Sequence, residues 1–171
     1  MYVYDPAADA WREGRKPPFS HYDSIATTIS DKIYIYPGLE NSATYNTKPS
    51  QISLFTYSPS RDNLNEISWE EKNLRSKKEI IGLFSLADNL FLLIKETKFD
   101  KDHIIPLFYN KNNNNWIYLE TIEIFETQNL TTISFQNQIH ILGGKTGLNK
   151  FSQMHNAFQA IYTIIVPLIP Q

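Results

Sequence analysis

Residues 136–144 read QNQIHILGG: a polar turn leads into a short run of β-branched and aliphatic residues, which ends in two glycines. Related stretches occur at 30–38 (SDKIYIYPG) and at 87–94 (ADNLFLLI). Asn, Asp and Gly favour tight turns, and apolar runs of this kind favour strands. Each stretch therefore predicts a turn followed by a short β-strand.

Apolar segments also precede these turns, so each turn is predicted to join two antiparallel strands in a hairpin. The first strands of the three hairpins are expected at 25–29, 80–86 and 130–135. A third strand is expected at 52–57, 104–109 and 158–166, and the segment around each tryptophan is expected to supply a fourth. No stretch shows sustained helical periodicity, so the predicted fold class is all-β.

Pairs of tyrosine and tryptophan recur about every 52 residues. Tyr4 is followed by Trp11, Tyr109 by Trp116 at the same spacing, and Tyr57 by Trp69 after a loop that is expected to be five residues longer. A fixed period of this length is typical of repeat architectures in which each repeat is one supersecondary unit. The chain is therefore predicted to consist of repeated four-strand units.

This order of elements resembles the kelch repeat: a small-residue strand, a hairpin, a strand that ends in Gly-Gly, a loop, a strand that ends in Tyr-Asp-Pro, and a later Trp. The resemblance covers essentially the whole chain. Gly143-Gly144 matches the paired glycines of the family, Pro37-Gly38 keeps only the second, and Ile94-Lys95 keeps neither. The resemblance implies a kelch-type β-propeller arc of four-stranded antiparallel blades in an incomplete ring.

In such a blade, glycines permit special backbone torsions and aromatic rings fill the wedge between neighbouring blades. A rival interpretation, in which the tryptophans stack on sugar rings, is disfavoured because their spacing follows the repeat. The structural repeat positions are Tyr4, Trp11, Gly38, Tyr57, Trp69, Tyr109, Trp116, Gly143, Gly144 and Tyr162.

The chain is predicted to be a single partial propeller domain, 1–171. Residues 1–16 are expected to end a blade, 20–74 and 78–120 to form whole blades, and 128–166 to supply the first three strands of another. Closed propellers typically have about four to eight blades. Three explanations stay open: the sequence is a fragment of a longer chain with additional blades, two copies close a ring by self-association, or the arc stands open.

Composition excludes several classes of function. The chain has 171 residues, of which 42% are hydrophobic and 20% charged, and its formal net charge is −2. Neither sign of charge forms a long block, so no nucleic-acid or membrane partner is expected. The absence of cysteine rules out disulfides, thiolate metal sites and the Tyr-Cys crosslink of galactose-oxidase-type propellers.

No signal peptide or transmembrane segment is visible, so the compartment is unknown, with the cytoplasm slightly favoured.

A search for catalytic and cofactor motifs finds none. The four histidines are His21, His103, His140 and His155, and no two have the spacing of a zinc-ligand pair. His140 is predicted to be a packed or partly exposed strand residue. No Gly-x-Ser-x-Gly elbow or phosphate-binding loop is present, so no metal, cofactor or catalytic residue is expected.

Strand alternation predicts that two sets of loops line one rim of the arc. The first set joins second to third strands, and the second set leads into the next blade. Loops carry function more often than scaffold strands do. In kelch propellers that bind acidic peptides or sialic acid, an arginine is common at the position that His21 holds here. The first set of loops is expected at 39–50, 95–103 and 145–156, and the second set at 13–22, 72–79 and 121–129. The candidate ligand-binding residues on these loops are Arg15, His21, Tyr45, Lys98, Lys145, Lys150 and His155.

Two functions remain open. The favoured one is a non-catalytic kelch-repeat binding or scaffold module that engages a protein, a peptide or a glycan through rim loops. The alternative is a fragment of a carbohydrate-active kelch propeller enzyme, similar to sialic-acid mutarotases, whose active site is completed by missing blades. Such a site would need arginine and glutamate near the central channel, whereas the predicted first strands carry small residues such as Ala26, Gly82 and Ser134. The sequence therefore favours binding.

Overall fold

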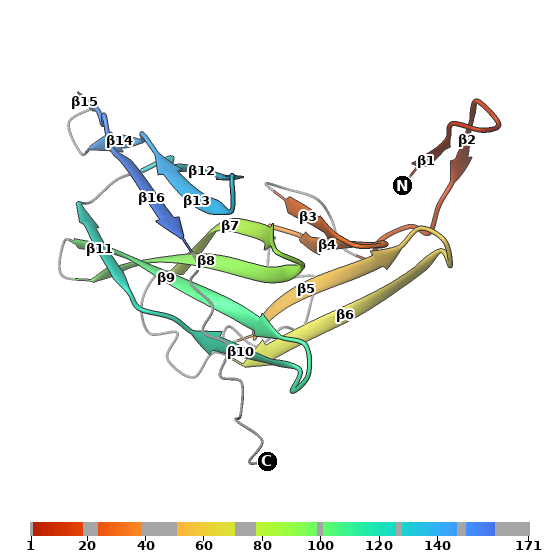
Figure 1. The fold of residues 1–171 in the computed structure, drawn as a ribbon, viewed down its shortest axis with the longest axis horizontal. Helices are drawn as coiled ribbons and strands as arrows, with labels where there is room; N and C mark the ends of the chain where they lie inside the picture. Colours follow the sequence, from red (N-terminus) through yellow and green to blue (C-terminus); the bar gives the residue numbers. More distant parts are fainter. Residues whose placement is uncertain are drawn as a thin grey trace, which may run out of the picture.

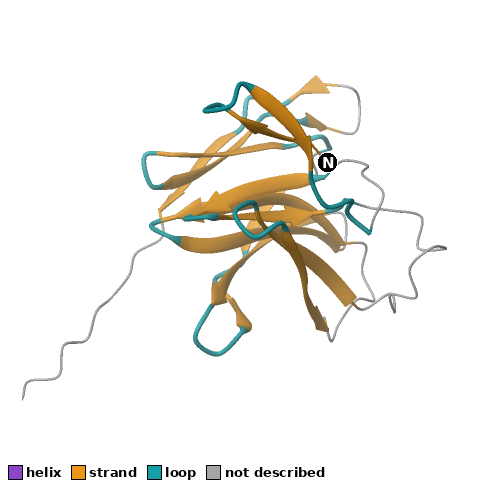
Figure 2. Cartoon of the chain, turned by 90° about the vertical axis from the view of Figure 1, so that its right-hand side faces the viewer, coloured by secondary structure: helices purple, strands orange, loops and turns teal. Residues whose placement is uncertain are grey.

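The computed structural model describes residues 2–18, 24–38, 51–70, 78–98, 101–125, 128–146 and 150–159. These residues form sixteen β-strands and no helix (Figures 1 and 2), so the predicted all-β fold class is confirmed. All of the strand pairs are antiparallel. Within these ranges there is no helix long and apolar enough to cross a membrane.

The first large sheet has four strands in the order β3-β4-β5-β6. Ser30 and Asp31 make the turn between β3 and β4, and Ser30 has a positive φ of 54°. The hairpin and the third strand predicted in this part of the chain are confirmed. The strands are β3 (Ile25–Ile29), β4 (Lys32–Tyr36), β5 (Gln51–Ser58) and β6 (Asn63–Glu70).

The second sheet has the order β10-β9-β8-β7, and β11 also pairs with β9. The loop predicted at 95–103 is wrong, because β8 continues to Lys98 and β9 begins at Lys101. The loop predicted at 121–129 is wrong in part, because the pairing of β11 with β9 extends the sheet past residue 120. The strands are β7 (Lys78–Leu86), β8 (Asn89–Lys98), β9 (Lys101–Asn110), β10 (Asn115–Tyr118) and β11 (Ile122–Phe125).

The third sheet has three strands in the order β12-β13-β16, and a short β14-β15 hairpin lies between β13 and β16 in the chain. The sequence predicts the third strand at 158–166, but it begins at His155, inside the loop predicted at 145–156. Residues 160–166, with Tyr162, lie outside the described residues. The strands are β12 (Thr131–Phe135), β13 (Gln138–Leu142), β14 (Lys145–Thr146), β15 (Lys150–Phe151) and β16 (His155–Gln159).

A separate N-terminal hairpin, β1 (Tyr2–Asp5) and β2 (Ala10–Glu13), contacts the first sheet mainly through the residues that follow β2. The backbone N–H of Arg15 donates to Oδ1 of Asp62 at 3.0 Å. Gly14 lies so close to the sheet that an added Cβ would be 3.1 Å from the hydroxyl of Tyr57 and 3.2 Å from Val3. The hairpin is therefore held at the turn between β5 and β6.

The second sheet is buried on both faces, because an apolar cluster lies between it and each neighbouring sheet. Side chains alternate between the two faces along a strand. Residues 90–94 of β8 therefore enter the two clusters in turn, which explains why this strand is an unbroken apolar run. The first cluster joins Ile29, Tyr34, Tyr36 and Leu54 of the first sheet to Leu83, Leu90, Leu92, Ile94, Ile105, Leu107 and Tyr109 of the second sheet. The second cluster joins Phe84, Leu86, Phe91, Leu93, Ile104 and Ile124 of the second sheet to Ile139 and Ile141 of the third sheet.

The first strands of the three sheets approach one another, since β3 and β12 both contact β7 (Figure 1). The register of β7 shifts between Ile80 and Gly82, and the hydroxyl of Thr132 on β12 donates to the carbonyl oxygen of Ile81 at 2.6 Å. A Cβ on Gly82 would lie 2.8 Å from that hydroxyl oxygen and 2.4 Å from the ring of Phe84. Glycine at this position therefore permits the close approach of two sheets.

Three hairpin turns, β1-β2, β5-β6 and β9-β10, share one geometry. In each, a tyrosine hydroxyl donates to the side-chain oxygen of an Asp or Asn five residues later, which has a positive φ. Asp and Asn adopt left-handed torsions more easily than most residues do. The pairs are Tyr4 with Asp9 (2.6 Å, φ 46°), Tyr57 with Asp62 (2.7 Å, φ 47°) and Tyr109 with Asn114 (φ 51°).

The shared turn corrects the expected position of the second tryptophan. Tyr4 lies opposite Trp11 and Tyr109 opposite Trp116, but Tyr57 lies opposite Leu64. The turn after Tyr57 is therefore no longer than the other two. Trp69 lies opposite Ile52, farther along the same strand pair, and is not the equivalent of the other tryptophans.

Replacing Asn114 with alanine tests the shared turn. The substitution removes the acceptor for the Tyr109 hydroxyl and places alanine at a positive φ, so we expect a loss of about 1–2 kcal/mol in the free energy of unfolding, measured with urea. Asn113→Ala is the matched control in the same tract, because Asn113 contributes its backbone N–H to Asn110. Equal losses for the two variants would contradict the role of Asn114.

Candidate functional site

Among the described residues, the second sheet extends beyond the point at which β4 and β13 end. Strands β4 and β13 end before Gly38 and Gly143, whose φ values are 90° and 62°. The corresponding residues of the second sheet are Ile94 and Lys95, and neither has a positive φ. Strand β8 continues for four residues beyond Ile94. The loss of the glycines thus goes together with a longer β8-β9 hairpin.

Four side chains of this extension form a row across four strands, called here the charged row: Lys78, Glu96, His103 and Glu123. The strand register places Lys78 opposite Glu96, Glu96 opposite His103, and His103 opposite Glu123. Opposed residues of neighbouring strands share a face of the sheet. Ile94, two residues before Glu96 on β8, belongs to the first apolar cluster, so the charged row continues that face beyond the core.

Glu96 is buried, with 3% of its side chain exposed. One carboxylate oxygen lies 2.5 Å from Nζ of Lys98, and the other lies 3.8 Å from Nζ of Lys78, whose side chain is also buried. Removing a charge from water is costly unless a partner compensates for it. The two ammonium groups therefore offset the cost of burying this carboxylate at the end of the core.

The opposite face of the extension carries a second buried carboxylate. Asp102 is 1% exposed and accepts a hydrogen bond of 2.6 Å from the hydroxyl of Thr97, which lies opposite it in the register. On the same face, Lys95 forms an ion pair of 3.0 Å with Glu79. Buried charges therefore lie on both faces of the extension.

The outer part of the extension is open to solvent. Nζ of Lys101 lies 2.5 Å from Oε1 of Glu123, and both side chains are more than half exposed. The hydrogen bond from Lys101, followed by the charge of its ammonium group, lowers the pKa of Glu123. Glu123 is therefore a carboxylate at neutral pH and is accessible to a ligand.

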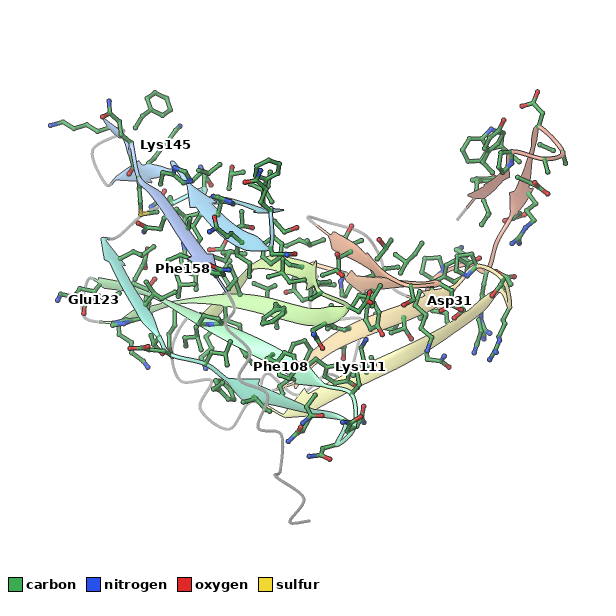
Figure 3. The ribbon with its side chains drawn as sticks, in the orientation of Figure 1. Asp31, Phe108, Lys111, Glu123, Lys145 and Phe158 are labelled. Atoms are coloured by element: carbon green, nitrogen blue, oxygen red, sulfur yellow. The ribbon has the colours of Figure 1, made fainter. Side chains whose placement is uncertain are left out.

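The extension lies on the side of the molecule that the sequence predicts as the rim. Figure 3 shows Glu123 and Lys145 on one side, whereas Asp31 and Lys111, which occupy turns, lie toward the other side. Lys111 donates to the carbonyl oxygen of Asp88 in the neighbouring turn. The chain thus presents charged groups at both ends of the strands, and the two buried carboxylates, Glu96 and Asp102, lie at the end with Glu123.

Four of the predicted ligand-binding residues lie in strands rather than in loops. Lys98 ends β8, Lys145 is in β14, Lys150 is in β15 and His155 begins β16. The expected loops are occupied by strands because β8 and β9 extend and because a short hairpin forms after Gly144. Arg15 does lie in a loop, after β2.

The structure does not bring all of these candidates together. Lys145 and Lys150 share the β14-β15 hairpin, where Nζ of Lys145 lies 5.6 Å from the ring centre of Phe151. Lys98 belongs to the extension. His21 and Tyr45 lie outside the described residues.

His155 instead pairs with His140. Nδ1 of His140 lies 3.0 Å from Nε2 of His155, and the two rings stack with their centres 5.3 Å apart. His140 is a half-buried strand residue, as predicted, and its Nε2 atom is buried without a hydrogen-bond partner. Among the described residues, no group of three or more His, Cys, Asp or Glu side chains could hold a metal ion.

Sequence reasoning missed most of the residues that form the extension: Lys78, Glu96, Lys101, Asp102 and Glu123. A signal is present in the middle repeat, where Ile94-Lys95 stands in place of the glycines. Residues 95–98 read KETK, an alternation that places Glu96 and Lys98 on one face of a strand. Recognising this alternation would have extended the predicted strand into the charged region.

The arrangement provides ion pairs and hydrogen bonds. Burial raises the pKa of Tyr36 to about 12, with a further contribution from the charge of Glu79, and burial also raises the pKa of Tyr57. These hydroxyl groups are therefore neutral donors at neutral pH. The exposed and buried charges of the extension fit recognition of a polar or charged ligand.

No protein-family model matches this chain, and no curated protein matches it at a significant level of similarity.

Replacing Glu96 with glutamine tests the buried ion pairs. The variant removes the charge that faces Lys78 and Lys98, so we expect the free energy of unfolding to fall by about 3 kcal/mol. Glu123→Gln is the matched control, because its pair with Lys101 is exposed and exposed ion pairs contribute little to stability. Urea denaturation of both variants measures the difference, and a Glu96→Gln loss no larger than the control would contradict this account.

Proposed function

We propose that this chain is a kelch-type propeller arc that acts as a non-catalytic binding module. The charged row and the neighbouring residues of the β8-β9 extension bind a protein, a peptide or a glycan. Charged and polar side chains held on rigid strands recognise ligands with less loss of conformational freedom than side chains on loops.

Three features support the propeller arrangement. A four-stranded, a five-stranded and a three-stranded antiparallel sheet stack through apolar faces. Their first strands, β3, β7 and β12, approach one another at one edge of the stack. The Tyr-Asp or Tyr-Asn turn recurs in three copies at the same place in the strand order.

The observation that carries the binding proposal is the burial of Glu96 and Asp102 at the rim end of the second sheet. Burying a charge is costly for a scaffold, so two buried carboxylates at one end of a sheet support a role for this end beyond packing. Four lysines of the extension, at positions 78, 95, 98 and 101, accompany the carboxylates. Because the extension carries both positive and negative side chains, it favours a ligand that offers both hydrogen-bond donors and acceptors.

No specific observation favours the carbohydrate-active alternative. The first strands β3 and β12 contain no charged residue, and the charged residues of β7, Lys78 and Glu79, lie at its rim end and form ion pairs there. The described first strands therefore supply no convergent arginine and glutamate.

Arrays of immobilised peptides and glycans, probed with the labelled chain, test the binding proposal. We expect the wild type to retain a peptide or a glycan, and Lys101→Ala and Glu123→Ala to weaken that binding at least about tenfold in a titration. Lys111→Ala, on the other side of the molecule, is the matched control and should bind as the wild type does. No retained ligand, or equal weakening by Lys111→Ala, would contradict the proposal, and accelerated anomer exchange of free sialic acid would support the enzymatic alternative.

A further inference from the structure

The three larger sheets stack in the same orientation, so that the same face of each sheet packs on the sheet that precedes it in the chain. The face of the second sheet that carries Leu90 and Leu92, called here the front face, packs on the first sheet. The opposite face, called the back face, carries Phe91 and Leu93 and packs on the third sheet. The third sheet likewise uses the face with Ile139 to pack on the second. Within this chain, a front face always covers the back face of the preceding sheet.

The N-terminal hairpin presents a front face that is not covered. Val3 faces the first sheet, because it lies beside Gly14 and Tyr57, and Tyr4 therefore lies on the other face of β1. Tyr4 is paired with Trp11, and these side chains are 44% and 70% exposed. Two large aromatic rings on one face of an isolated hairpin form an apolar surface.

The same aromatic pair occurs elsewhere in the chain in a covered state. Tyr4 and Trp11 have their ring centres 5.1 Å apart at an angle of 45°, and Tyr109 and Trp116 have theirs 5.1 Å apart at 46°. Tyr109 is buried in the first apolar cluster, and Trp116 packs against that cluster. The repeat thus shows what covers such a pair, namely the back face of a preceding sheet.

The third sheet presents a back face that is not covered. Ile133 and Phe135 of β12 lie on this face and are 44% and 58% exposed. Their equivalents before the corresponding turn of the second sheet are Phe84 and Leu86, each 6% exposed in the second cluster. The stacked His140 and His155 lie on the same face, since His140 is opposite Ile133 in the register.

We propose that the front face of the N-terminal hairpin of one copy of this chain docks on the back face of the third sheet of a second copy. The occupant is a second copy because the chain itself twice packs a front face of this repeat on a back face of the same kind. The contact joins two different surfaces, so it is heterologous and builds a closed ring or an open chain of copies. The proposal rests on the packing of the repeats and not on the charged row.

Sedimentation velocity of the full chain over a range of concentrations tests the proposal. We expect the wild type to associate, and Trp11→Ser and Phe135→Ser each to sediment as monomers. Phe151→Ser is the matched control, because Phe151 is 81% exposed on β15 and belongs to neither face. It should associate as the wild type does.

Mixing the two monomeric variants tests the polarity of the contact. Trp11→Ser retains the back face of its third sheet, and Phe135→Ser retains the front face of its hairpin, so an equimolar mixture should form a heterodimer and no larger species. A monomeric wild type, association that survives Phe135→Ser, or a mixture that stays monomeric would overturn the proposal. Circular dichroism confirms that each variant is folded, and Tyr4→Ser with Ile133→Ser provides a second pair if one of the first variants unfolds.

Discussion

Burial of the second sheet on both faces is the constraint on which the rest of this structure depends. Strand β8 has paired neighbours on both sides and an apolar cluster on each face, so residues 90–94 lie at the centre of the fold. A one-residue slip of its register would exchange the two faces and disrupt both clusters at once. The first and third sheets are positioned by these clusters, and the approach of β3 and β12 to β7 follows from that packing.

The charged extension follows from the same sheet. Where β4 and β13 are ended by glycines with positive φ, β8 has no glycine and continues in extended conformation beyond the core. Beyond Ile94, the face that carries Leu90 and Leu92 continues with Glu96 and Lys98. The residues of β7, β9 and β11 that lie in line with Glu96, namely Lys78, His103 and Glu123, are charged or titratable as well, which produces the charged row. A change at the end of one strand thus has consequences across four strands.

Much of the fold could be predicted from the sequence, because local signals specify hairpins. The turns at Ser30, Ala87 and Gln136, with apolar runs on both sides, identified the first two strands of the three larger sheets. Strand ends were less predictable, since they depend on pairing: β11 exists because it meets the extended β9, and β16 begins at His155 because that residue lies opposite Leu142. The site was largely missed, because a buried ion pair such as Glu96 with Lys98 is a tertiary feature that composition does not reveal. Trp69 was misassigned because Leu64 takes the place of tryptophan in that turn.

Hydrogen exchange of the backbone amides, followed by mass spectrometry on the full chain, tests the central claim most directly. Strands that are paired on both sides and buried on both faces should open only with the whole fold, whereas a hairpin with one packed face opens more easily. The account predicts the slowest exchange in β8 and β9, and much faster exchange in the β1-β2 hairpin. Exchange in β8 as fast as in β1 and β2 would contradict the claim that the second sheet is the buried centre of this protein.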